Sequence, residues 1–205
     1  MGPLVVCCAY CRRGDEKKLR ASASKDSKKL TPKKREEALA ELKKFCSFRW
    51  VEVSADDLNR LMKTMSLNDI EAMVMCDLIK QLRVGMDIMI DMPDRYSWTF
   101  RKRMEKFGVD KFEAEHKADE TYPIVAAASI YAKVLRDKKV SEIAKLVGDF
   151  GSGYPGDKKT SNALKDMEFM TKLKPFIRER WKTIEDLKQK KLFGDEQDGE
   201  SDDSE

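Results

Sequence analysis

Apolar residues along the chain fall alternately into short runs and into helical spacings. The residues from Leu4 to Tyr10 form one continuous apolar run, which is typical of a strand buried on both faces. The segment from Met86 to Asp91 reads the same way, and 48–53 and 112–116 favour two further strands. Because helical patterns separate these strands, the sequence predicts an α/β fold.

Helix-start signals mark several of the helices between these strands. Thr31 followed by Pro32 predicts a helix to about residue 46, because threonine caps an N-terminus and proline suits the first turn. Two serines, each followed three residues later by an aspartate, predict two helices within 54–82, broken near Met65. These pairs are Ser54 with Asp57 and Ser66 with Asp69.

The second half of the chain is predicted to be mainly helical. Asp94 directly precedes a predicted helix, 95–107, and is the expected N-cap. The alanine-rich segment from Pro123 to Val147 predicts a long helix whose small residues allow close packing on a sheet. Basic helices are predicted near 158–170 and 174–191, where lysines line phosphate or form a solvated face.

Charge is distributed unevenly along the 205 residues. The net charge is +4, but residues 195–205 contain seven acids and no base, so the first 194 residues carry a net +11. A body this basic favours phosphate-bearing partners. The acidic tail has no apolar residue to bury and is predicted to be disordered, with solubility or competition with nucleic acid as its role.

Composition also bears on the cellular compartment and on whether the protein binds zinc or a membrane. Five cysteines, an odd number, favour reduced thiols and a cytoplasmic protein. Cys8 and Cys11 form a Cys-x-x-Cys, but no second pair exists and there is one histidine, so incidental thiols are favoured over structural zinc. No apolar run approaches the ~20 residues of a membrane span, and no membrane partner is expected.

Three positions carry candidate chemistry, each with a structural alternative. Asp91 ends an apolar strand, where it suits a metal ligand or a helix cap equally well. Asp119 suits a metal ligand or the start of a helix, and Tyr154, after Gly151-Ser-Gly153, suits a ligand contact or a turn. His116 is the single histidine, which is more often structural than catalytic.

Three segments carry a resemblance to a known family. They are His116-Lys-Ala-Asp-Glu-Thr-Tyr-Pro-Ile-Val-Ala-Ala-Ala-Ser-Ile130, Gly148-Asp-Phe-Gly-Ser-Gly-Tyr-Pro155 and Lys25-Asp-Ser-Lys-Lys-Leu-Thr-Pro-Lys-Lys-Arg-Glu-Glu37. In this order they resemble the ribonuclease HII family, most closely its archaeal branch, and the similarity runs from Gly2 to about Phe193.

The resemblance implies a fold and an activity. The expected fold is a ribonuclease H-like mixed sheet flanked by helices (1–155), followed by a helical C-terminal extension (156–193) and the acidic tail (194–205). The expected enzyme is an endonuclease that cuts the RNA strand of RNA–DNA hybrids and ribonucleotides embedded in DNA. It is expected to act as a monomer.

The resemblance also assigns roles to residues. Asp91 and Asp119 would bind Mg²⁺ or Mn²⁺, the hard ions that two-metal phosphodiester hydrolysis uses. Tyr154, with Gly153 beside it, would stack on the sugar at the RNA-to-DNA junction, and His116 would orient a carboxylate or the metal water. Backbone phosphates would be held by Lys25, Ser27 and Lys28.

One family motif is absent from the 205 residues. Family members begin with a central strand ending in Asp-Glu-Ala-Gly-Arg-Gly, whose two acids bind metal, and this chain starts just beyond it. We therefore expect the first central strand to be missing and Met1 to be an internal residue of a longer natural protein. The alternatives are an inactive hybrid-binding remnant and a general RNA-binding protein.

Overall fold

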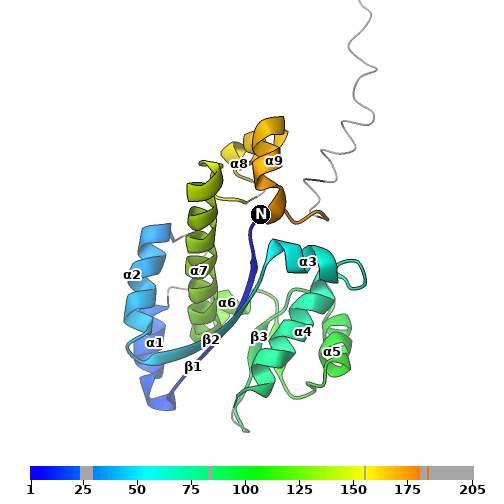
Figure 1. Cartoon of the computed structure of the whole chain (residues 1–205). Coiled ribbons are helices and arrows are strands. Elements are labelled where there is room, and N and C mark those ends of the chain that lie inside the picture. The colour runs from blue at the N-terminus through cyan, green and yellow to red at the C-terminus, as the bar shows by residue number, and fades with distance from the viewer. Residues whose placement is uncertain (24–29, 83–84, 155, 181–183, 185–205) are drawn as a thin grey trace, which may run out of the picture.

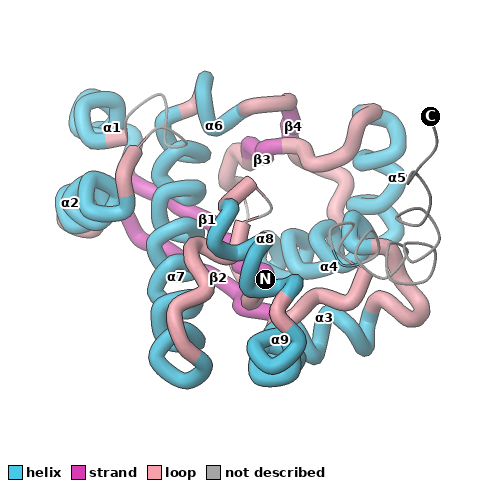
Figure 2. Tube along the Cα trace, turned by 90° about the horizontal axis from the view of Figure 1, so that it is seen from above, coloured by secondary structure: helices cyan, strands magenta, loops and turns pink. Residues whose placement is uncertain are grey.

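The described residues form two small sheets surrounded by helices. The computed structural model describes residues 1–23, 30–82, 85–154, 156–180 and 184. In this part of the chain β1 (Leu4–Cys11) pairs antiparallel with β2 (Cys46–Val53), and β3 (Met89–Asp91) pairs parallel with β4 (Glu113–Glu115). The expected mixed α/β fold is confirmed, although the strands form two separate pairs (Figure 2).

The long helix α7 (Pro123–Val147) is the central support of the molecule (Figure 1). Its predicted bounds are confirmed, and its buried alanines Ala126 and Ala127 let it approach the strands closely. Tyr131 of α7 stacks on Phe48 and Trp50 of β2, with ring centroids 4.7 and 5.0 Å away. The helices α1 (Glu16–Ser22) and α2 (Pro32–Leu42) pack on its other side.

The predicted helix starts of the first half are confirmed. Thr31 caps α2 by accepting a hydrogen bond from the Lys34 amide, at 3.3 Å, although α2 ends at Leu42 and not near residue 46. Ser54 caps α3 (Ala55–Leu61), and Ser66 forms a capping box with Asp69 at the start of α4 (Leu67–Lys80). The predicted break near Met65 is confirmed, because α3 ends at Leu61 and α4 begins at Leu67.

Asp94 is not the expected helix cap. The helix α5 (Ser97–Lys106) begins three residues later, and its N-cap residue Tyr96 makes no side-chain cap bond. Asp94 is 2% exposed, pairs with Arg103 Nε at 2.8 Å and accepts a hydrogen bond from Asn68. A buried carboxylate gains more from a guanidinium partner than from a cap, so the residue ties α5 to α4 instead.

A groove separates the two pairs of strands. Every residue of β1 is only half-buried, where full burial was expected, and β3 covers three residues where six were expected. A cavity of about 340 Å³ lies between them, with side chains of α4 and α7 on its walls. Within the described strands, β1 pairs only with β2 and β3 only with β4, so their facing edges border this groove.

The C-terminal helices pack on the far end of α7. The predicted helix near 158–170 is two helices, α8 (Lys158–Lys165) and α9 (Met167–Leu173), because Asp166 caps α9 by accepting from the Phe169 amide at 2.8 Å. A short 3-10 helix, Lys174–Phe176, follows. Residues 177–180 are not helical, so the predicted 174–191 helix is wrong there. The remainder of that prediction, apart from Ile184, and the acidic tail lie outside the described residues beyond Arg180.

The first residues of the chain are held by the last described ones. The Gly2 amide donates to the Phe176 carbonyl at 2.9 Å, and Arg178 Nε donates to the Gly2 carbonyl at 3.0 Å. Met1 lies in one apolar cluster with residues of α7, α8 and α9. The domain boundary expected near residue 155 stays a prediction.

Two further observations concern composition. All five cysteines are free thiols, and burial raises the pKa of the Cys46 thiol to about 12. No helix in the described ranges is long and apolar enough to cross a membrane.

We predict that Asp94→Ala lowers the free energy of unfolding by about 2 kcal/mol, because Arg103 keeps only one of its two carboxylate partners in a partly buried site. Urea unfolding measures the loss. Asp56→Ala, on the exposed face of α3, is the matched control and should change stability by less than about 0.5 kcal/mol. Equal effects of the two substitutions would contradict a structural role for Asp94.

Candidate metal and nucleic-acid site

The two candidate metal ligands are brought together from different elements. Asp91 ends β3, and its Oδ1 accepts a hydrogen bond from the Ala118 amide at 3.1 Å. Ala118 directly precedes Asp119, and both begin the short helix α6 (Ala118–Thr121). The hydrogen bond therefore fixes the end of β3 against the residue next to the second carboxylate.

Asp119 lies in the first turn of a helix, which is the structural setting that its sequence position also suited. Lys117 adopts a left-handed conformation, φ 56°, which turns the chain from β4 into α6. The Asp119 side chain is 3% exposed, and its Oδ2 lies 4.0 Å from Lys133 Nζ of α7. A carboxylate is costly to bury without an opposite charge, and Lys133 supplies one.

His116 lies in the turn between β4 and α6, three residues before Asp119. Its side chain is exposed and makes no hydrogen bond or ion pair with the described part of the chain. Its expected role, to orient a carboxylate or the metal water, stays a prediction. The phosphate-binding residues expected from the sequence, Lys25, Ser27 and Lys28, lie outside the described residues.

The glycines before Tyr154 are required for conformation and for space. Gly151 and Gly153 have φ values of 85° and 71°, which side chains of L-residues rarely adopt. A Cβ on Gly151 would overlap Asp157 Oδ2, and one on Gly153 would lie 3.1 Å from Arg136 Nη2. The loop therefore holds Tyr154, 41% exposed, at a defined place on the surface.

Asp157 fixes the 151–154 loop through hydrogen bonds. Its Oδ2 accepts hydrogen bonds from the Ser152 amide, from the Ser152 hydroxyl at 2.8 Å and from the Thr160 hydroxyl at 3.1 Å. The Gly153 amide in turn donates to Thr160 Oγ1 at 2.9 Å. The Ser152 backbone bond and the further hydrogen bonds stabilise the ionised carboxylate and lower the pKa of Asp157 to about 2.

Arg136 of α7 supports the Tyr154 ring directly. Its guanidinium carbon lies 3.6 Å from the ring centroid, and its Nη1 donates to the Ser152 carbonyl at 3.1 Å. The Arg136 side chain is largely buried. Its position three residues after Lys133 places both cations on one face of α7, so a single helix supports the carboxylates and Tyr154.

The donor set fits a hard divalent ion in kind. Asp91 and Asp119 offer carboxylate oxygens, which Mg²⁺ and Mn²⁺ prefer. In the part of the chain that is described, no group of three or more His, Cys, Asp or Glu side chains lies together. These two aspartates therefore supply only part of a coordination sphere.

Fold and site together define an α/β protein of the ribonuclease H-like class, with helices flanking small sheets, one aspartate at a strand end and a second at the start of a helix. The family model described as ribonuclease HII matches residues 1–184. The chain belongs to the ribonuclease HII family and is a ribonuclease by that membership.

Similar proteins support the assignment over nearly the full chain. Ribonuclease HII of Archaeoglobus fulgidus is 38% identical over 192 residues, with 94% of this chain and 92% of that protein covered. Ribonuclease HII of Methanocaldococcus jannaschii is 37% identical over 218 residues, with coverage of 94% and 93%.

Solved structures agree in fold. The ribonuclease HII in the "PCNA:RNase HII complex from Archaeoglobus fulgidus" has a TM-score of 0.81 at 38% identity, with 95% of this chain and 93% of that one covered. Ribonuclease H2 from Pyrococcus horikoshii has a TM-score of 0.73 at 29% identity, with coverage of 92% and 93%.

We predict a pH-dependent contribution of Asp157 to stability. Because its folded pKa lies below the ordinary value of 3.8, its stabilisation is present above about pH 4 and is lost as the pH falls toward 2. Thermal melts of wild type and Asp157→Asn should differ at pH 5 and converge by about pH 2. A constant difference across this range would contradict the assignment.

We predict that Arg136→Met weakens binding of an RNA–DNA hybrid about tenfold, because the Tyr154 ring loses its cationic support. A double-mutant cycle with Tyr154→Ala, measured as hybrid affinity without divalent metal, tests the mechanism. Arg136→Met should add little to Tyr154→Ala. Full additivity of the two losses would show that Arg136 acts independently of Tyr154.

Proposed function

We propose that this protein cuts the RNA strand of RNA–DNA hybrids internally, and also ribonucleotides embedded in duplex DNA. The observation that carries the proposal is the shared support of the two halves of the site. Lys133 of α7 faces the buried Asp119, and Arg136, one turn on, lies under Tyr154. One helix therefore contacts both the carboxylate and the tyrosine loop, which supports a site that would cleave at a chosen nucleotide.

Asp91 and Asp119 are the residues that would hold Mg²⁺ or Mn²⁺. When bound, such ions activate water and stabilise the leaving oxygen in phosphodiester hydrolysis. The protein's own part is to hold both carboxylates in place. The Ala118 amide binds Asp91, and Lys133 lies near Asp119.

Tyr154 and its loop would select the substrate. The exposed ring stacks on a sugar while Arg136 holds its opposite face, and Gly153 lets the backbone approach the same nucleotide. A 2′-hydroxyl is the group that distinguishes RNA from DNA, so a contact with it at this point gives RNA selectivity. Lys25, Ser27 and Lys28 would bind neighbouring phosphates.

The groove between β1 and β3 bears on whether the metal site is complete. Two strand edges face it, and α4 and α7 cover it with apolar side chains, which suits an extended segment buried on both faces. We propose that a further strand with additional carboxylates lies there in the active enzyme. The rest of the ligand set would then come from that strand, beside Asp91 at the edge of the groove.

Hybrid binding without cleavage is the second candidate function. The pair Asp91 and Asp119, without a third acidic ligand among the described residues, favours it for residues 1–205 alone. The basic body and the Tyr154 loop do not depend on metal, so binding would persist without hydrolysis.

We predict that Asp119→Asn lowers hybrid cleavage by a factor on the order of 1000, because a metal ligand is lost, while hybrid affinity stays within about threefold. Cleavage of a labelled hybrid with Mg²⁺ or Mn²⁺ and binding without metal are measured in parallel. Glu120→Gln, the exposed acid next in the chain, is the matched control and should cut like wild type.

The same assay separates the two candidates. Wild-type turnover in Asp119→Asn would refute the metal-ligand assignment. Tight binding with no cleavage by residues 1–205, restored by a peptide that completes the groove, would support an incomplete metal site. Binding with no cleavage under any of these conditions would favour the second candidate.

A further inference from the structure

An exposed aromatic pair lies at the start of α5, and the function proposed above does not use it. Tyr96 and Trp98 are 52% and 65% exposed. Their rings are stacked, with centroids 6.4 Å apart and an interplanar angle of 22°. Large aromatic side chains usually bury most of their surface, so two exposed neighbours with aligned rings indicate a binding surface.

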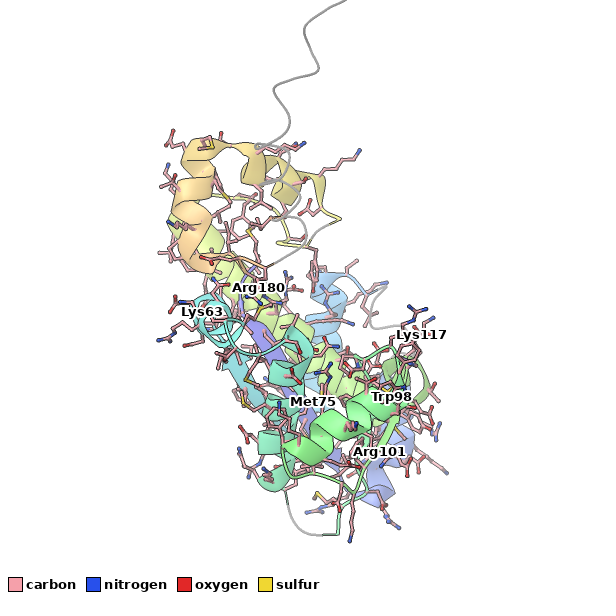
Figure 3. All side chains as sticks on the ribbon, turned by 90° about the vertical axis from the view of Figure 1, so that its right-hand side faces the viewer. Lys63, Met75, Trp98, Arg101, Lys117 and Arg180 are labelled. Carbon is pink, nitrogen blue, oxygen red and sulfur yellow. The ribbon has the colours of Figure 1, made fainter. Side chains whose placement is uncertain are left out.

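Cations surround this pair. Arg95 lies over the Tyr96 ring, with its guanidinium carbon 5.4 Å from the centroid. Arg101 and Lys102 follow on the next turn of α5, and both are exposed. Trp98 and Arg101 lie along the same helix on the side of the molecule that faces the viewer in Figure 3.

Charge neutralisation within the protein does not remove this positive surface. Between residues 95 and 107 the single acid is Glu105. Arg103 forms ion pairs with Asp94 and Asp69. Arg95, Arg101 and Lys102 are exposed, and Arg101 also lies over the Phe112 ring, with its guanidinium carbon 5.0 Å from the centroid. Aromatic faces beside arginine and lysine are the pattern that binds bases and phosphates of a nucleic-acid strand.

The pair lies close to the candidate metal site along the chain. Tyr96 follows Asp91 by five residues, so their backbones are at most about 18 Å apart. That distance corresponds to a few nucleotides.

We propose that Tyr96 and Trp98, with Arg95 and Arg101, form a stacking platform for unpaired bases of a single strand that leaves the candidate metal site. The inference rests on the proposed function only for the direction of the strand. Single-stranded nucleic acid is the favoured occupant, because a base inside a duplex has no free face to stack on an aromatic ring. The basic flank matches its phosphates.

The test is the affinity of the protein for a single-stranded DNA oligonucleotide of about a dozen nucleotides, measured without divalent metal so that nothing is cut. Trp98→Ala and Tyr96→Ala should each weaken binding about tenfold. Leu146→Ala, which truncates a 76% exposed side chain on α7, is the matched control and should change affinity less than about twofold.

A second oligonucleotide of the same length, with abasic sites in place of its bases, isolates stacking from charge. Wild type and Trp98→Ala should bind it equally, whereas Arg101→Gln should still bind it more weakly and lower the salt slope by about one. An equal loss on both oligonucleotides in Trp98→Ala would overturn the platform. The platform would also be overturned if Trp98→Ala bound the oligonucleotide with bases as tightly as wild type does. That result would leave a protein partner as the alternative occupant.

The outcomes are separate from those for the proposed function. If Trp98→Ala weakens single-strand binding but wild type does not cut hybrids with metal, the platform stands and the nuclease assignment fails. If wild type cuts hybrids and Trp98→Ala binds single strands unchanged, only the platform is overturned.

Discussion

The close packing of α7 on β1 and β2 is the constraint on which the rest of the structure depends. Ala126 and Ala127 are almost fully buried, so the helix axis lies nearer to the strands than larger side chains would permit. This distance sets where Lys133 and Arg136 meet the carboxylate and the tyrosine loop. A larger residue at either alanine would displace both halves of the site together, because both are supported by one rigid helix.

Local signals were sufficient for most of the helices. The Ser66 capping box and the Thr31 cap follow from side chains that act on their own backbone within four residues, which a sequence displays directly. The start of α7 follows from Pro123, because proline suits the first turn of a helix. The errors arose where a distant partner decides the outcome. Asp94 stands in a good capping position but binds Arg103, and β1 stays half-buried because a groove and not a strand lies beside it.

In the candidate site too, some residues could be predicted from the sequence and others depend on distant contacts. Asp91 was found from a strand end, and both aspartates from a family resemblance. The start of a helix was the structural alternative for Asp119, and Asp119 does lie there. Arg136 and Asp157 were missed, because an arginine within a long charged helix and an aspartate in a loop carry no distinctive spacing. Their significance comes from contacts with Tyr154 and Ser152 that only the folded chain creates.

The contact between Gly2 and the Phe176–Arg178 segment has a consequence for folding. The Arg178 bond closes a loop of 176 residues, so the start of β1 cannot reach its final place until nearly the whole chain exists. At ordinary rates of synthesis, about 9 to 35 s pass between the making of the two partners. For most of that interval α7 has not been made, so it does not yet cover β1. This contact therefore forms late, after the C-terminal helices have been made.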